Sequence, residues 1–85
     1  MKNDEFLREI QRFHGKLGGW EIVIDRFSET EYILGCYYDE EEHTWKVYKN
    51  AERGMHSIRL STPNEDLAFN KLFSMVEFVY KIINR

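Results

Sequence analysis

The residues of this 85-residue chain that could carry out catalysis are one cysteine, three histidines and a run of acidic residues. The histidines, His14, His43 and His56, fall in different predicted elements, and none has the spacing of paired metal ligands. Cys36 lies within an apolar segment, where a lone cysteine usually serves packing; a nucleophilic role with a histidine is the alternative. We therefore expect no metal site, no cofactor and no enzymatic activity.

Four consecutive carboxylates, Asp39 to Glu42, form the densest cluster of charge. In a turn these side chains point in different directions, and nothing nearby would remove water from one of them. A raised pKa and acid–base catalysis are therefore not expected. Two alternatives remain, a solvated turn that keeps the protein soluble, or an acidic rim that steers and docks a basic partner.

Composition and charge restrict the class of protein. Eighty-five residues predict a single domain, 1–85, with a small core to which two Trp, five Tyr and six Phe contribute. The net charge of −3 argues against nucleic-acid binding, which needs a clustered basic surface. No run approaches the roughly 18 apolar residues of a membrane span, and the charged start does not resemble a signal peptide. With one unpaired cysteine, we expect a cytoplasmic protein that does not bind membranes.

The element with the clearest pattern is a long helix predicted over residues 62–85. Thr62, Pro63 and Glu65 match a capping box with proline at the first helical position. At about 100° per residue, apolar side chains cover about two thirds of the circumference, more than contact with one sheet requires. One flank is expected to lie beneath the first helix or to mediate self-association, and it carries Phe69, Phe73 and Tyr80.

Periodicity upstream predicts one further helix and four strands. Helical spacing places Phe6, Ile10, Phe13 and Leu17 on one face, and Gly15, then Gly18-Gly19, end that helix. Alternating or continuous apolar runs predict strands over residues 20–25, 31–39, 44–50 and 55–61, with short polar turns between them. The predicted fold is α+β, an N-terminal helix, a four-stranded antiparallel β-meander and a long C-terminal helix packed on one sheet face.

The alternation of the strands assigns their side chains to two faces. The face toward the long helix is expected to carry Trp20, Ile22, Ile24, Leu34, Trp45, Val47, Ile58 and Leu60. The opposite face would show Val23, Ile33, Tyr37 and Tyr48 around Gly35, with Lys46 and Arg59 nearby. Such tyrosines with a charged rim are typical of a protein interface, although scattered exposed apolar residues are also normal on a sheet.

The second half of the chain resembles a known group of proteins. The string Trp45-Lys46-Val47-Tyr48, then Glu52-Arg53-Gly54 and a helix with Glu65, Ala68 and Phe73, is similar to a pattern in small immunity proteins of bacterial polymorphic-toxin systems. The resemblance implies a cytosolic α+β protein that binds and neutralises one cognate toxin domain and is not an enzyme. Arg53 would then anchor the partner, since arginine is enriched at interface hot spots.

The leading hypothesis is therefore a cytosolic protein that occludes the active site of a basic toxin domain through its sheet face and its acidic hairpin. Its expected partner contacts are Tyr37, Asp39, Glu40, Glu41, Glu42, Tyr48, Glu52 and Arg53. The alternative is a small structural or regulatory module without catalytic activity. That module would form a homodimer through Phe69, Phe73 and Tyr80.

Overall fold

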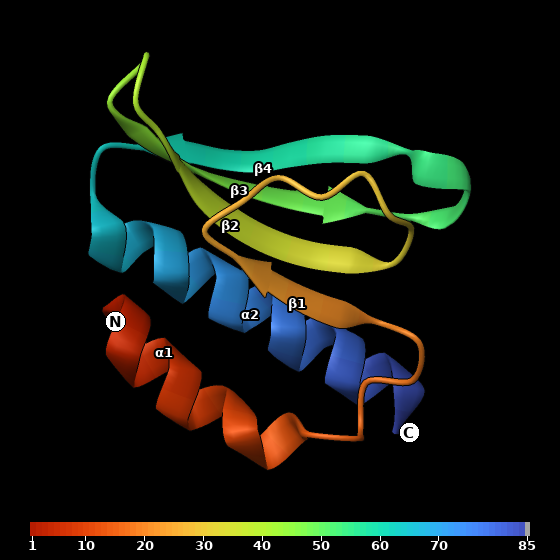
Figure 1. Ribbon diagram of the computed structural model, residues 1–85. Coiled ribbons are helices and arrows are strands. Elements are labelled where there is room, and N and C mark those ends of the chain that lie inside the picture. The colour runs from red at the N-terminus through yellow and green to blue at the C-terminus, as the bar shows by residue number, and fades with distance from the viewer. Residues whose placement is uncertain (85) are drawn as a thin grey trace.

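The computed structural model describes residues 1–84 and shows an α+β fold in which one layer is a sheet and the other is helical (Figure 1). The sheet has the order β1-β2-β3-β4, α2 packs against it, and α1 contacts α2. The elements in chain order are α1 (Asn3–Glu9), the 3-10 helix η1 (Ile10–Phe13), β1 (Glu21–Ile24), β2 (Ile33–Asp39), β3 (Thr44–Asn50), the 3-10 turn η2 (Glu52–Gly54), β4 (His56–Thr62) and α2 (Glu65–Ile83). The predicted last helical residue, Arg85, lies outside the described residues.

The predicted antiparallel meander is wrong for its first pair of strands, because β1 and β2 are parallel. The other two pairs, β2 with β3 and β3 with β4, are antiparallel as predicted. Residues 25–32, which we call the crossover loop, do not form the predicted turn but return the chain to the start of β2 (Figure 1). β1 has only four residues and is therefore about 13 Å long. The eight residues of the crossover loop can reach about 26 Å, so they return the chain to the start of β2 without a helix.

Tyr48 on β3 fixes the crossover loop to the outer face of the sheet. Its hydroxyl donates a hydrogen bond to the carbonyl of Arg26 (3.0 Å) and accepts one from the N–H of Ser28 (2.9 Å). Its ring lies directly over Gly35 of β2, where a Cβ atom would be only 2.2 Å away. The glycine is therefore required for the ring to reach the loop.

Asn50, at the end of β3, holds the same loop with its buried side chain. Its Nδ2 donates to the carbonyls of Ser28 (2.6 Å) and Thr30 (2.9 Å), and its Oδ1 lies 2.7 Å from Nδ1 of His56. Phe27 of the loop packs against the Tyr48 ring, with 4.9 Å between centroids. The loop consequently covers part of the face that the sequence predicted to be free.

A β-bulge changes which side chains of β4 face α2. Val47 pairs with Leu60, whereas the next residue, Tyr48, pairs with Ile58, so Arg59 is the extra residue. The predicted alternation is wrong beyond this point. Ile58 shares the outer face with Tyr48 and is 52% exposed, while Arg59 turns toward α2.

The main core lies between the sheet and the helices. It includes the apolar residues predicted for the first helix, whose side chains pack on α2, and in particular the Phe6 and Phe69 rings lie 5.4 Å apart. The buried members are Phe6, Phe13, Leu17, Leu34, Cys36, Val47, Ala68, Phe69, Leu72, Val76 and Val79.

The start of α2 differs from the predicted capping box. Asn64 is the N-cap, and its side chain accepts a hydrogen bond from the N–H of Leu67 (3.1 Å). Thr62 instead accepts from the N–H of Asn64, and the Glu65 carboxylate accepts from the N–H of Asn3 (3.0 Å). Asparagine caps helices at least as well as threonine. Glu65 instead connects α2 to α1 through its hydrogen bond with Asn3.

Candidate functional site

The hairpin between β2 and β3 projects from the sheet on the side away from the helices (Figure 1). Asp39 shapes its turn, because one carboxylate oxygen accepts hydrogen bonds from the N–H groups of Glu41 (3.0 Å) and Glu42 (3.2 Å). His43 completes the reversal with a φ of 55°. The turn is therefore held by its own side chain, and the tip presents a defined set of charges.

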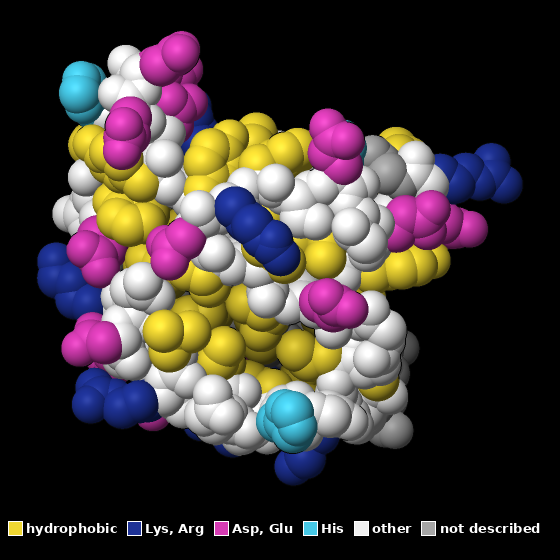
Figure 2. Space-filling model, in the orientation of Figure 1, with side chains coloured by type: hydrophobic (Ala, Val, Ile, Leu, Met, Phe, Trp, Pro, Cys, Tyr) yellow, Lys and Arg dark blue, Asp and Glu magenta, His cyan; other side chains and the backbone are white. Residues whose placement is uncertain are grey.

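Three of the four carboxylates at this tip, Asp39, Glu40 and Glu41, have no cationic partner among residues 1–84. Glu42 is paired with Lys46 (2.6 Å), and this hydrogen bond raises the pKa of the lysine. Glu40 and Glu41 are exposed and form no ion pair in the described part of the chain. Figure 2 shows acidic side chains gathered at the upper left, over the hairpin tip.

An aromatic pair lies at the base of this hairpin. The rings of Tyr38 and Trp45 meet edge to face at 5.3 Å, and Trp45 also contacts the buried ring of Phe69 at 5.5 Å. Tyr38 remains 41% exposed. Aromatic side chains anchored on a core, next to unpaired charges, are typical of protein-binding surfaces.

Most of the remaining predicted partner contacts do not join this tip. Tyr48 is fully buried beneath the crossover loop and cannot touch a partner in this conformation, and Tyr37 is half-buried beside Phe27. Glu52 and Arg53 lie at the opposite end of β3, roughly 20 Å away, because β3 has seven residues. The structure thus brings together Asp39 to Glu42, and it places Tyr37 next to them, opposite the Lys46 that binds Glu42.

The predicted self-association flank of α2 is covered by the chain itself. Phe69 is buried, Phe73 stacks near Phe6 and Phe13, and Tyr80 meets Phe13 at 5.1 Å. The exposed flank of α2 is a different one. It carries Leu67, Phe78 and Ile82, which are 53%, 59% and 44% exposed.

Cys36 has no geometry for catalysis. It is fully buried in the core, and this burial raises the pKa of its thiol to about 12. The thiol is therefore protonated at neutral pH, whereas a nucleophilic cysteine needs its thiolate. Within residues 1–84, no three metal-ligating side chains lie close enough together to hold an ion.

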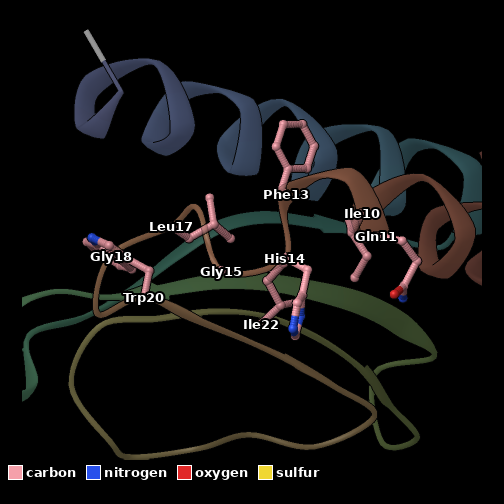
Figure 3. A pocket seen from close by; sticks show the side chains of 9 residues that line it. All are labelled: Ile10, Gln11, Phe13, His14, Gly15, Leu17, Gly18, Trp20 and Ile22. Carbon is pink, nitrogen blue, oxygen red and sulfur yellow. The ribbon is translucent and has the colours of Figure 1, made fainter.

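A hollow of about 200 Å³ opens between η1 and β1, visible at the lower centre of Figure 2. In Figure 3, Phe13 points toward α2, and its neighbour His14 points away from it at the rim. His14 is the only titratable residue in the lining, so the hollow offers shape rather than acid–base chemistry. The lining residues are Ile10, Gln11, Phe13, His14, Gly15, Leu17, Gly18, Trp20 and Ile22.

Sequence reasoning did not identify this hollow. The feature of the sequence that could have indicated the hollow is the short glycine-rich stretch after the first helix. In it, Gly15 and Gly18 adopt positive φ values of 71° and 61°. These turns carry the chain from η1 to β1 without filling the space between them. Glycine tolerates such conformations without strain because it has no Cβ.

Comparison with known proteins gives no relative. The chain matches no protein-family model, no curated protein and no solved structure. None of the helices in residues 1–84 is both long enough and apolar enough to cross a membrane.

Proposed function

We propose that this chain is a cytosolic protein-binding domain of the immunity type, without catalytic activity, that occludes the active site of a basic toxin domain. The observation that supports this most directly is the projecting β2–β3 hairpin, which carries two exposed carboxylates, Glu40 and Glu41, that form no ion pair among residues 1–84, beside an aromatic pair in which Tyr38 is exposed. The acidic tip would steer a basic partner, and the aromatic base would supply the apolar contact.

The buried thiol supports a binding role over catalysis. Cys36 is protonated and inaccessible, and the hollow beside η1 is lined by no carboxylate or cysteine. The hairpin also fits occlusion in its shape, because a narrow projection enters a concave active site more easily than a flat sheet face does. Two segments, residues 45–48 and residues 52–54, resemble the pattern of immunity proteins and point to the same class.

Reversing the charge of Glu40 and Glu41 is expected to slow association with the basic partner about tenfold at low salt. The on-rate should also become less sensitive to ionic strength, because steering depends on unscreened charge. The partner would be captured from a lysate of the source cell on the immobilised wild-type chain. Its association with both proteins would then be followed by stopped-flow fluorescence between about 20 and 500 mM salt.

The matched control is the charge reversal of both Glu9 and Glu29, which changes the net charge by the same amount. Both residues are exposed and form no ion pair among residues 1–84. This variant should associate almost as fast as the wild type. Equal slowing by both double variants would assign the effect to net charge alone. Wild-type rates in both would remove the hairpin from the interface.

A second candidate is a self-associating module, favoured by the exposed apolar flank of α2 rather than by the flank that the sequence predicted. Phe78→Glu is expected to convert a dimer into a monomer in light scattering, since burial of the exposed Phe78 would drive association. Leu7→Glu, at an apolar α1 position of similar exposure, is the control and should leave the dimer intact. A folded wild-type monomer at micromolar concentration would exclude this candidate.

A further inference from the structure

The bulge in β4 gives the sheet a cationic surface over the second half of α2. Leu34, Lys49 and Ser57 form one row across β2, β3 and β4, and the bulged Arg59 turns to the same side. Bulges commonly redirect a single side chain in this way next to functional sites. The sheet therefore presents a lysine and an arginine where its other rows present apolar residues.

The α2 side of this surface combines apolar residues with Lys71 and Ser74. Met75, Phe78 and Val79 face this part of the sheet across a groove of about 290 Å³, and Phe78 is 59% exposed. We call this space the cationic groove, and it is lined by Leu34, Lys49, Arg59, Lys71, Ser74, Met75, Phe78 and Val79. Cations from both the sheet and α2 thus border an apolar surface that is formed mainly by α2.

The positive charges of the groove are not neutralised within the described residues. Its lining contains three cations and no carboxylate. Arg59, Lys71 and Lys49 take part in none of the ion pairs of residues 1–84, unlike Arg12, which approaches Glu77 at 3.7 Å. Lys49 does contact the Trp20 ring, with its Nζ 5.4 Å from the centroid, which restrains the side chain without cancelling its charge.

We propose that the cationic groove binds a small amphipathic carboxylate, a medium-chain fatty acid or a similar organic acid. The carboxylate would lie between Arg59 and Lys71, since a guanidinium offers two parallel donors to a carboxylate. The alkyl chain would replace water against Phe78 and its apolar neighbours. A volume near the lower end of known ligand sites, about 300 Å³, favours a small ligand over a whole lipid. This inference does not depend on the proposed function.

The test is isothermal titration of the full chain with sodium decanoate below its micellar concentration. Decanoate is expected to bind at one site per chain, and Arg59→Gln or Lys71→Gln should weaken binding about tenfold each. Phe78→Gln should weaken decanoate binding similarly, because it removes part of the apolar surface. Arg8→Gln, an exposed α1 arginine outside the groove and without an ion pair in residues 1–84, is the matched control and should bind as the wild type.

Two comparison ligands separate the contributions of charge and chain. Decan-1-ol keeps the chain and lacks the charge, and inorganic phosphate keeps a charge and lacks the chain, so both should bind at least tenfold more weakly than decanoate. Equal binding of decanol would show a non-specific apolar surface, and equal binding of phosphate would show a simple anion site; either result would overturn the proposal. Circular dichroism of each variant would confirm that the fold is retained, and a loss of decanoate binding in Arg8→Gln would also contradict the proposal.

Discussion

Replacement of Gly35 by alanine is expected to lower the free energy of unfolding by about 3 kcal/mol or more, as measured by urea denaturation. The added Cβ would lie 2.2 Å from Cζ and 2.3 Å from Cε1 of Tyr48. The Tyr48 ring cannot move aside easily, because it is fully buried and its hydroxyl is bonded to Arg26 and Ser28. Relief of the clash therefore requires either separation of β2 from β3 or detachment of the crossover loop.

Gly19→Ala is the control for this prediction. Gly19 has no positive φ, and its added Cβ would meet no atom within 4 Å, so the free energy of unfolding should change by less than about 0.5 kcal/mol. Gly35→Ala should also cost less when Tyr48 is shortened to valine, because the clashing ring is then absent. The same cost in both backgrounds would show that contact with Tyr48 is not the cause.

Asn50→Ala is expected to cost about 2–3 kcal/mol and to loosen the crossover loop. The substitution removes the donors that bind the carbonyls of Ser28 and Thr30 and the acceptor beside His56, all from a fully buried side chain. Buried carbonyls without donors are costly, so the loop is expected to move away from the sheet. Amide hydrogen exchange should accelerate in residues 25–32 more than in α2.

Asn70→Ala provides the matched control. Asn70 is an exposed asparagine whose side chain accepts one hydrogen bond, from the terminal amino group of Met1 (3.0 Å). Its loss is expected to change stability by no more than about 0.5 kcal/mol and to leave exchange in the crossover loop unchanged. Exchange that is equally slow in Asn50→Ala and the wild type would contradict the assigned role of Asn50.

The helical part of the fold was predictable because its apolar periodicity is long and uninterrupted. The spacing of Phe6, Phe13 and Leu17 identified three side chains that are indeed buried, and the burial of Phe69 and Val76 follows the predicted face of α2. The wide apolar circumference of α2 also predicted two packing partners correctly. These are the sheet and α1 with its η1 extension.

The pairing of β1 was not predictable from its pattern. Alternation in residues 21–24 is the same for a parallel and an antiparallel neighbour, and the following residues contain no glycine or proline to mark a tight turn. Phe27 was the available signal, because an aromatic residue in a polar connection needs a surface to cover. The turning points of the crossover, Asp25 and Tyr32, have positive φ values of 72° and 58°. Aspartate is enriched in this conformation, but tyrosine is not, and neither residue predicts that the chain crosses over.

The faces of the β4 side chains and the grouping of the site residues were predicted wrongly for related reasons. Residues 57–60 alternate regularly between polar and apolar, so nothing in the sequence indicates that Arg59 is the extra residue. Strand length, in turn, places the two ends of β3 apart, which separates the acidic hairpin from Glu52 and Arg53. The acidic turn itself was predicted correctly, because its position depends only on local sequence.

The crossover loop also implies an order of assembly. β2, β3, β4 and α2 are joined by short connections and can form early, whereas β1 gains its place only when the loop reaches Tyr48 and Asn50, about 20 residues later in the chain. The ion pair between the amino group of Met1 and Asp66 (3.0 Å) closes a still longer loop. The first third of the chain is thus expected to join the folding nucleus last and to be the first part to detach when the protein unfolds.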